Sequence, residues 1–489
     1  MIPIGETHDG RADMTNFEMD LFDTRMHTAK MVKDEDDTCC SGSSSRKHIV
    51  KPACLPITIL SFLIVALVFL PLFKDEDLEA PERMSLVANC KNPCSIKLVE
   101  SIPTGVTFSG PTHDPTWKTW IDIIDSTNDY LDIAALYWNL RDNQTLFPTA
   151  DKGTSVFNAL VRALNRGVKI RIAQDGSGGL SKNEDSEYLK KEGAQVRDVN
   201  VSRLLGSGVI HTKFIISDMK TVYIGSANMD WKSLTEVKEL GVYLGECECV
   251  ASDLYRIFAI YWRLGEEDSR IPAKWPISYR TQYNAANPMD FPMIGVEEMG
   301  RLFISSSPRP FNPKGREDDL AAITHLIGSS NHSVCVAVMD FLPMTLYMKN
   351  NIFWPSLDIS IRDAAFRGVS VRLLISRWSH TRNATLPFLK SLMAINDGLP
   401  SRQGKRGSID IRTFVVPSDE KQAKIPFARV NHNKYMVADN VSYIGTSNWA
   451  GDYFITTAGV GFALNSSSMS RQLQSVFDRD WNSKYATHI

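Results

Sequence analysis

The chain has 489 residues, of which 43% are hydrophobic and 22% are charged; both proportions are ordinary for a folded protein. This length allows two or three domains, or one large duplicated domain. The formal net charge of −2 provides no overall attraction to nucleic acid or to acidic membranes, so any site for an anion must be local.

The N-terminal part predicts a membrane anchor. Residues 1–52 are polar without apolar periodicity, which indicates a disordered cytosolic tail. Residues 53–73 carry no charge and would form a helix of about 31 Å, the thickness of the bilayer core. A cleaved signal peptide would begin closer to residue 1, so we predict a transmembrane signal-anchor. Basic residues precede it, which predicts a cytosolic N-terminus, a lumenal stalk at 74–95 and a type II membrane protein.

Sequons and cysteines after this anchor fit an oxidising lumen. Five sequons are expected to carry glycans: Asn143, Asn200, Asn331, Asn383 and Asn465. Two close cysteine pairs suit two disulfides, whose connectivity the sequence leaves open: Cys90, Cys94, Cys247 and Cys249. Cys335 lies in an apolar run and is expected to be a buried free thiol.

Helical and strand patterns alternate after the stalk. Apolar strands are predicted at 130–138 and 168–175, with amphipathic helices between and around them, which predicts a largely parallel sheet covered by helices on both faces. The order then repeats, and residues 362–376 parallel residues 161–175. We therefore predict an internally duplicated α/β fold whose two pseudo-symmetric halves share one site. The predicted halves are residues 96–285 and 286–489.

One short motif occurs in both predicted halves, first as HTKFIISD…VYIGSAN and then as HNKYMVAD…SYIGTSN. Each copy predicts two strands joined by a turn. Side chains two apart on a strand share a face, so His211 lies beside Lys213, whereas Asp218 points away and has a structural role. The candidate catalytic residues are His211, Lys213, Asp218, His432, Lys434 and Asp439, and the candidate phosphate-binding or supporting residues are Asn228, Asn448, Ser226 and Thr446.

Two histidines, two lysines and two asparagines at one interface suit attack on a phosphodiester. A neutral histidine can attack phosphorus, and a protonated one can give its proton to the leaving alcohol. The lysines and asparagines would hold the phosphate charge. The sequence contains no metal-binding motif, so we expect a mechanism without a metal or other cofactor. A single His-x-Lys most often occurs by chance at a surface position, but two copies with matching spacing argue against chance. The remaining alternative to an active enzyme is a duplicated fold that has lost its activity.

These motifs resemble the paired HxKxxxxD signatures of the phospholipase D superfamily. The segments CKNPC, GSANMDWKSLTEVKELGV and YIGTSNWAGDYF resemble the phospholipase D3/D4 group of type II membrane glycoproteins, and the likeness covers roughly residues 85–485. It implies a two-step, metal-independent phosphodiesterase with His211 as nucleophile and His432 as general acid, or the reverse. It also implies a route from the endoplasmic reticulum and Golgi to the endolysosome.

Two substrate classes follow from this resemblance. One is the 5′ end of single-stranded DNA or RNA, cleaved by a 5′ exonuclease. The other is phospholipid, through hydrolysis of phosphatidylcholine to phosphatidate and choline or through lysosomal transphosphatidylation. The expected partners are therefore one of these substrates, the bilayer, and a second copy of the chain in a homodimer.

The resemblance also implies a carboxylate downstream of each catalytic histidine that orients its imidazole. Glu239 has this place after His211, whereas Thr456 stands where the second acid is expected. A hydroxyl cannot stabilise an imidazolium by charge, which favours His211 with Glu239 as the nucleophile. Asp452 is an alternative second acid. Thr456 is also the one feature that favours the alternative function, a catalytically weak or silent membrane-anchored binding protein.

Aromatic residues beside the motifs could stack on bases of a single strand or pack in the core. Core packing is favoured for each: Trp231, Trp449, Tyr453 and Phe454.

Overall fold

The computed structural model describes residues 92–178, 183–402 and 404–489, together with Ile59 and Arg83. The rest of the predicted tail, signal-anchor and stalk lies outside the described residues. Within the described part of the chain, no helix is long and apolar enough to cross a bilayer. The described residues from 92 onward belong to the compact unit that spans residues 75–489.

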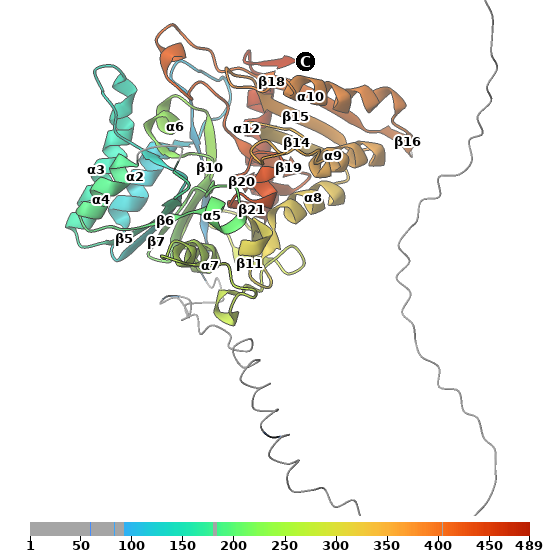
Figure 1. The fold of residues 1–489 in the computed structure, drawn as a ribbon. Coiled ribbons are helices and arrows are strands. Elements are labelled where there is room, and N and C mark those ends of the chain that lie inside the picture. The colour runs from blue at the N-terminus through green and yellow to red at the C-terminus, as the bar shows by residue number, and fades with distance from the viewer. Residues whose placement is uncertain (1–58, 60–82, 84–91, 179–182, 403) are drawn as a thin grey trace, which may run out of the picture. The chain divides into compact units, whose positions relative to one another are not determined.

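Two large sheets form the framework of this unit (Figure 1). The first has the strand order β2-β1-β10-β8-β7-β3-β5-β6, and a short separate sheet pairs β4 with β9. These strands are β1 (Ser95–Ser101), β2 (Asp114–Pro115), β3 (Tyr130–Ala135), β4 (Trp138–Asn139), β5 (Lys169–Asp175), β6 (Gln195–Val199), β7 (Phe214–Ser217), β8 (Thr221–Gly225), β9 (Met229–Asp230) and β10 (Glu239–Gly245).

The second sheet has the order β11-β12-β21-β20-β19-β14-β15-β18-β22, with β13 beside β12, and β16 pairs with β17 separately. These strands are β11 (Met289–Pro292), β12 (Met299–Ser307), β13 (Glu317–Asp318), β14 (Ser333–Val338), β15 (Ser370–Ser376), β16 (Ser401–Arg402), β17 (Lys405–Arg406), β18 (Ser408–Phe414), β19 (Lys434–Ala438), β20 (Val441–Gly445), β21 (Gly459–Asn465) and β22 (Ala486–His488). The strand order from β12 to β18 corresponds to the strand order from β1 to β6 in the first sheet. Each pair of neighbouring strands is also parallel or antiparallel in the same way as its counterpart.

Helices cover both sheets. They are α2 (Thr116–Ser126), α3 (Asp151–Asn165), α4 (Glu184–Lys191), α5 (Val201–Leu205), α6 (Trp231–Thr235), α7 (Glu248–Leu264), α8 (Asp319–Ser329), α9 (Ser356–Arg367), α10 (Thr385–Ala394), α11 (Asp452–Ile455) and α12 (Ser467–Trp481). Short 3-10 turns lie at Pro148–Ala150, Ile277–Tyr279, Arg309–Phe311, Ile395–Gly398 and Gln422–Lys424. Figure 1 shows α2, α3 and α4 on the outer side of the first sheet and α8, α9 and α10 on the outer side of the second.

The fold is mixed α/β, and the prediction of a largely parallel sheet is wrong. In the first sheet, β3, β5 and β6 run parallel, and the two-residue β2 pairs parallel with β1, whereas β1, β10, β8, β7 and β3 are successively antiparallel. The physical reason lies in the pairing: crossovers of a dozen residues or more give the parallel pairs among β3, β5 and β6, and the motif hairpin is antiparallel because its turn is tight. The antiparallel pairs β1–β10, β10–β8 and β7–β3 join strands that the order of elements along the chain does not specify.

Side-chain alternation divides the core into layers. On β3 and β7, Ile133 and Ile215 face the outer core with α2 and α3, whereas Ala134 and Phe214 face a central core. The central core also contains the inner face of the second sheet and apolar residues of α7 and α12. Because both sheets bury one face in this shared core, the motif hairpins meet inside the unit.

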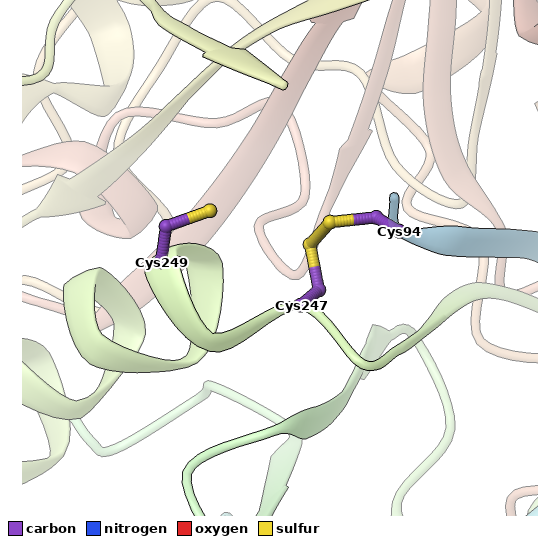
Figure 2. Close-up of side chains that lie close together, drawn as sticks. All are labelled: Cys94, Cys247 and Cys249. Atoms are coloured by element: carbon purple, nitrogen blue, oxygen red, sulfur yellow. A yellow bond between two sulfur atoms is a disulfide. The ribbon is translucent and has the colours of Figure 1, made fainter. Parts of the chain in front are cut away.

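A disulfide joins the beginning of the first sheet to α7. Cys94 bonds to Cys247, and the Cys249 sulfur lies nearby (Figure 2). Cys249 is itself disulfide-bonded, and Cys90 lies outside the described residues. Cys335 is a buried free thiol, as its apolar run predicted.

Candidate active site

The two motif hairpins are β7–β8 and β19–β20, each closed by an aspartate with positive φ, 47° at Asp218 and 49° at Asp439. The Asp218 carboxylate accepts the backbone N–H groups of residues 128–130 at 2.8 to 2.9 Å. The Asp439 carboxylate does the same for residues 331–333 at 2.8 to 3.1 Å. Both carboxylates therefore hold the segments that lead into β3 and β14, and neither faces the histidines, as strand alternation predicted.

Main-chain bonds between the two sheets hold both histidines. The His211 N–H donates to the Ala458 carbonyl just before β21, and the His432 N–H donates to the Lys238 carbonyl just before β10, both at 2.8 Å. Each histidine is thus fixed by the sheet to which it does not belong. The structure therefore brings both motifs to one place, as the sequence predicted.

The two imidazoles have chemically different partners. The Nδ1 atom of His432 lies 3.0 and 2.9 Å from the two carboxylate oxygens of Glu239, and Ser233 Oγ donates to the same carboxylate at 2.9 Å. The Nδ1 atom of His211 lies 2.9 Å from the Thr446 carbonyl. Because a carbonyl only accepts, Nδ1 of His211 carries its proton and Nε2 keeps a free lone pair.

The prediction that Glu239 orients His211 is therefore wrong. Glu239 begins β10 directly after Lys238, whose carbonyl receives the His432 N–H, so the carboxylate reaches the histidine of the other sheet. Sequence spacing could not show this, because the pairing depends on how two separate sheets face each other.

Thr456 is also not the counterpart of Glu239. Gly225, the last residue of β8, pairs with Gly241 of β10, and Glu239 stands two residues before Gly241. In the second sheet, Gly445 of β20 pairs with Gly461 of β21, so the position that corresponds to Glu239 is Gly459. A Cβ atom at Gly459 would lie 2.2 Å from Ser447 Oγ, so no carboxylate fits there. The two histidines are therefore unequal: among the described residues, the His432 ring bonds a carboxylate and the His211 ring bonds a carbonyl.

Both motif lysines are buried beside their own histidines. The Nζ atoms of Lys213 and Lys434 donate at 2.5 Å to the carbonyls of His211 and His432. Burial and then the charge of Lys434 hold the pKa of Lys213 well below its usual value. Burial lowers the pKa of Lys434 to about 7, against the opposing pull of Glu239. An anion bound here would stabilise the charged form of both lysines.

The environments of the two imidazoles favour different protonation states. Burial holds the pKa of His211 well below its usual value, and the charges of Lys213 and Lys434 lower it further. Burial also lowers the pKa of His432, but Glu239 opposes this effect. Burial and the two lysines therefore favour the neutral form of His211, whereas Glu239 supports the protonated form of His432.

The remaining motif side chains divide into two groups. Asn228 lines the cavity, and the Asn448 amide donates to the Tyr453 hydroxyl at 3.1 Å. In contrast, the Ser226 hydroxyl bonds the backbone of Leu240, and Thr446 Oγ1 accepts the N–H of a β21 residue. Ser226 and Thr446 therefore join strands within the sheets, and neither is among the residues that line the cavity.

A cavity of about 440 Å³ opens over the histidines. Beside His211, His432, Glu239 and Asn228, its lining consists of Leu136, Tyr137, Asn139, Asp230, Lys232, Ser233, Val237, Met339, Trp378, Phe427 and Val430. Several of these follow strand ends, where α/β folds commonly place ligand-contacting loops. Tyr137 follows the end of β3, and this position could have indicated from sequence that it is a site residue. Its hydroxyl donates to Asp230 at 2.8 Å.

The aromatic residues next to the motifs belong to the core. Their exposed fractions are small: 1% for Trp231, 2% for Trp449, 6% for Tyr453 and 5% for Phe454. The Tyr453 ring meets the His211 imidazole edge to face at 5.0 Å, so it packs behind that imidazole.

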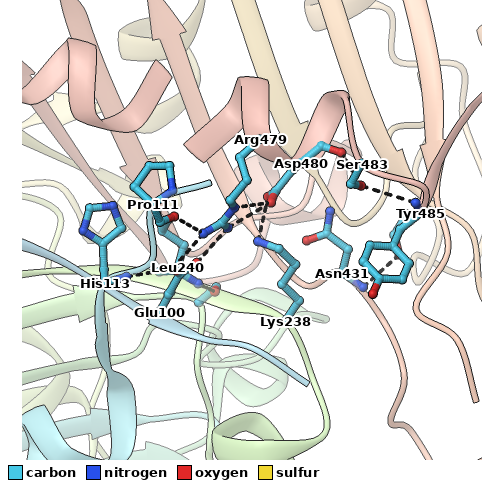
Figure 3. Close-up of polar contacts among 12 residues, drawn as sticks. Glu100, Pro111, His113, Lys238, Leu240, Asn431, Arg479, Asp480, Ser483 and Tyr485 are labelled. Atoms are coloured by element: carbon cyan, nitrogen blue, oxygen red, sulfur yellow. Dashed lines mark hydrogen bonds and ion pairs between the residues drawn. The ribbon is translucent and has the colours of Figure 1, made fainter. Parts of the chain in front are cut away.

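Four buried charges support the strand that holds His432 (Figure 3). Lys238 lies 2.7 Å from Asp480. Arg479 lies 2.9 Å from both Asp480 and Glu100. Two cations thus balance two anions away from water, a condition that buried charges require. Because the Lys238 carbonyl accepts the His432 N–H, this cluster fixes one wall of the site.

Two His-x-Lys pairs that meet at one cavity between two mixed sheets define a phosphodiesterase of the phospholipase D class. A family model described as "PLD3/4, PLD-like domain" matches residues 109–419, and the chain belongs to this family.

Individual relatives agree with this assignment. A Caenorhabditis elegans protein named probable phospholipase D is 56% identical, over 100% of this chain and 89% of its own length. The 5′-3′ exonuclease PLD3 of Homo sapiens is 42% identical, over 82% of this chain and 81% of its own length. Among solved structures, phosphatidylserine synthase of Haemophilus influenzae is similar in fold, with a TM-score of 0.50, 12% identity, and coverage of 76% of this chain and 85% of the other.

Proposed function

We propose that the protein cleaves phosphodiesters through a phospho-histidine on His211, with His432 as general acid. The observation that carries this proposal is the difference between the two imidazoles: the Nδ1–H of His211 is bound to a carbonyl, and His432 is bound to a carboxylate. The first arrangement leaves Nε2 a neutral nucleophile, and the second stabilises an imidazolium.

The chemistry takes two steps. In the first, the Nε2 lone pair of His211 forms a bond to phosphorus, the bond to the leaving oxygen breaks, and His432 gives that oxygen its proton. In the second, the now neutral His432 takes a proton from water, the water oxygen attacks phosphorus, and the P–N electron pair returns to His211. Lys213 and Lys434 balance the negative charge that develops on the non-bridging oxygens.

The first candidate substrate is the 5′ end of single-stranded DNA or RNA. In support, the PLD3 relatives are named 5′-3′ exonucleases, and aromatic side chains line the cavity, as sites that bind unpaired bases often require. The second candidate is a phospholipid, supported by the name of the C. elegans relative and by the apolar lining residues Val237, Met339 and Val430.

We further propose an internally duplicated domain behind a type II signal-anchor, glycosylated in the lumen of the secretory pathway and delivered to the endolysosome. The matching strand paths of the two sheets support the duplication. A disulfide suits an oxidising compartment. Four of the five sequon asparagines are exposed, and Asn200, which caps α5, is partly exposed. The homodimer stays a prediction.

The test uses the full-length chain in detergent, offered a single-stranded oligonucleotide with a 5′-hydroxyl and, separately, phosphatidylcholine vesicles. Stepwise shortening from the 5′ end, absent in His211→Asn, would establish the nucleic-acid reaction. Release of choline without shortening would assign the lipid reaction. If a folded protein cleaves neither, the binding-protein alternative is correct.

A further inference from the structure

Three aromatic rings lie in a row at the wall of the cavity, the first pair tilted and the second stacked. The His380 imidazole lies between the Trp378 indole, at a centroid distance of 4.6 Å and a tilt of 43°, and the Phe427 ring, at 4.8 Å and 26°. Trp378 and Phe427 both line the cavity that contains the histidine pair. We call Trp378, His380 and Phe427 the ring stack; it leaves one face of Phe427 without an aromatic partner among the described residues.

Phe427 is unusual in both exposure and backbone conformation. Its side chain is 64% exposed, although burial is the ordinary state of a phenylalanine. Its φ is 55°, a left-handed conformation that costs a bulky residue free energy. Folding therefore gains little from Phe427 at this position, and such exposed aromatic residues often mark a binding surface.

The segment that carries Phe427 is bonded to two turns next to the first sheet, one after β1 and one between α6 and β10. Arg429, two residues further, is buried and donates to the Glu236 carboxylate at 2.9 Å and to the Thr104 carbonyl at 3.0 Å. Its N–H also donates to the Glu236 carbonyl at 3.1 Å. The backbone next to Phe427 is thus held in place before any ligand binds, which lowers the entropy cost of binding.

We propose that the ring stack binds a nucleobase adjacent to the scissile phosphate of a single-stranded nucleic acid. This inference rests on the proposed function and specifies its substrate. The face of the Phe427 ring that His380 does not cover is flat, which matches a planar base. A quaternary ammonium such as choline prefers a cage in which several ring faces converge on one point, and the ring stack does not form such a cage.

The surroundings of the ring stack provide cations for the strand. Arg377 and Arg382, which flank the first two rings in the chain, are exposed. Arg382 is close enough to Asp340 to oppose the rise in pKa that burial imposes on that carboxyl. Lys232 lines the cavity itself, paired with Asp230 at 3.2 Å. A single strand would therefore meet both a stacking surface and positive charge, the usual combination for unpaired nucleic acid.

The test measures oligonucleotide binding to His211→Asn protein by fluorescence anisotropy, so that it does not depend on turnover. Two oligonucleotides are compared: one complete, and one whose first two residues at the 5′ end lack bases. Adding Phe427→Ala should weaken binding of the complete oligonucleotide about tenfold, within the range for one base–aromatic contact, and should leave the abasic one unchanged. Phe427→Trp should restore binding, and Phe366→Ala, an exposed phenylalanine on the outer helix α9, should change neither.

Equal weakening for both oligonucleotides, or no weakening, would overturn the proposal. Weaker binding of phosphatidylcholine vesicles without any effect on the oligonucleotides would overturn it as well, and would assign the ring stack to the choline group. If the base-dependent effect is found but the wild-type chain cleaves no oligonucleotide, the proposed reaction fails and the binding site stands.

Discussion

Replacing Glu239 with glutamine removes a negative charge beside His432 and keeps a hydrogen-bond acceptor of the same shape. The carboxylate lies 2.9 Å from Nδ1 of His432 and is fully buried. A hydrogen bond to a charged group contributes about 1.5 to 3 kcal/mol, and a neutral one about 0.5 to 1.5 kcal/mol. The imidazolium should therefore lose about 1 to 1.5 kcal/mol of stabilisation, which corresponds to about one pH unit.

The assay is the pH dependence of kcat/KM, which reports the pKa values of the free protein. The proposed mechanism requires neutral His211 and protonated His432. Since the pKa values of both lie below the usual value of 6.5, the wild-type profile should be bell-shaped with an acidic optimum. Loss of the Glu239 charge lowers the pKa of His432, so Glu239→Gln should move the alkaline limb to lower pH by about one unit and leave the acidic limb in place.

Ser233→Ala is the matched control, because it removes a donor to Glu239 and keeps the charge; its alkaline limb should move far less. If Glu239→Gln moves the acidic limb instead, the carboxylate serves His211 and the assignment of the two roles is wrong. An unchanged profile would refute the electrostatic role of Glu239 altogether.

Three further predictions concern stability, measured by denaturant unfolding. Asp218→Ala should cost about 2 kcal/mol, because three backbone N–H groups lose their acceptor, and should leave kcat within a few-fold; a large loss of kcat would contradict its structural role. Asp480→Asn should cost about 3 to 5 kcal/mol, since it leaves the buried Lys238 ammonium unpaired; an unchanged free energy of unfolding would contradict the structural role of this ion pair. Gly459→Ala should cost about 1 to 3 kcal/mol by overpacking. In contrast, Thr456→Val should leave both stability and activity near wild type. A large loss of activity in a stably folded Thr456→Val protein would show that Thr456 is a site residue.

Local patterns predicted the parts of the site that depend on neighbours in sequence. Strand alternation placed His211 with Lys213 and turned Asp218 away, because the direction of a side chain on a strand follows from residue parity alone. The repeated motif also predicted that His211 and His432 would meet. The same reasoning located the main helices and strands of each sheet, and failed on strand direction for the antiparallel pairs outside the hairpins, such as β1 with β10.

Contacts between the sheets could not be predicted in this way. The pairing of Glu239 with His432 crosses the interface between two sheets, and its residues are far apart in sequence. The register that makes Gly459 the counterpart of Glu239 depends on strand pairing and not on residue count. Phe427 gave no signal, because a lone aromatic residue in an irregular segment is indistinguishable from a core residue until its exposure is known.

The most direct test of the account is to identify the residue that carries phosphorus during turnover. The full-length chain would be mixed with a substrate phosphodiester that has an activated leaving group, quenched in alkali to preserve a phosphoramidate, and mapped by peptide mass spectrometry. We predict an adduct on the peptide that contains His211, longer-lived in His432→Asn because no group remains to activate water, and absent in His211→Asn. An adduct on His432, or turnover by His211→Asn at the wild-type rate, would contradict the assignment of nucleophile and acid.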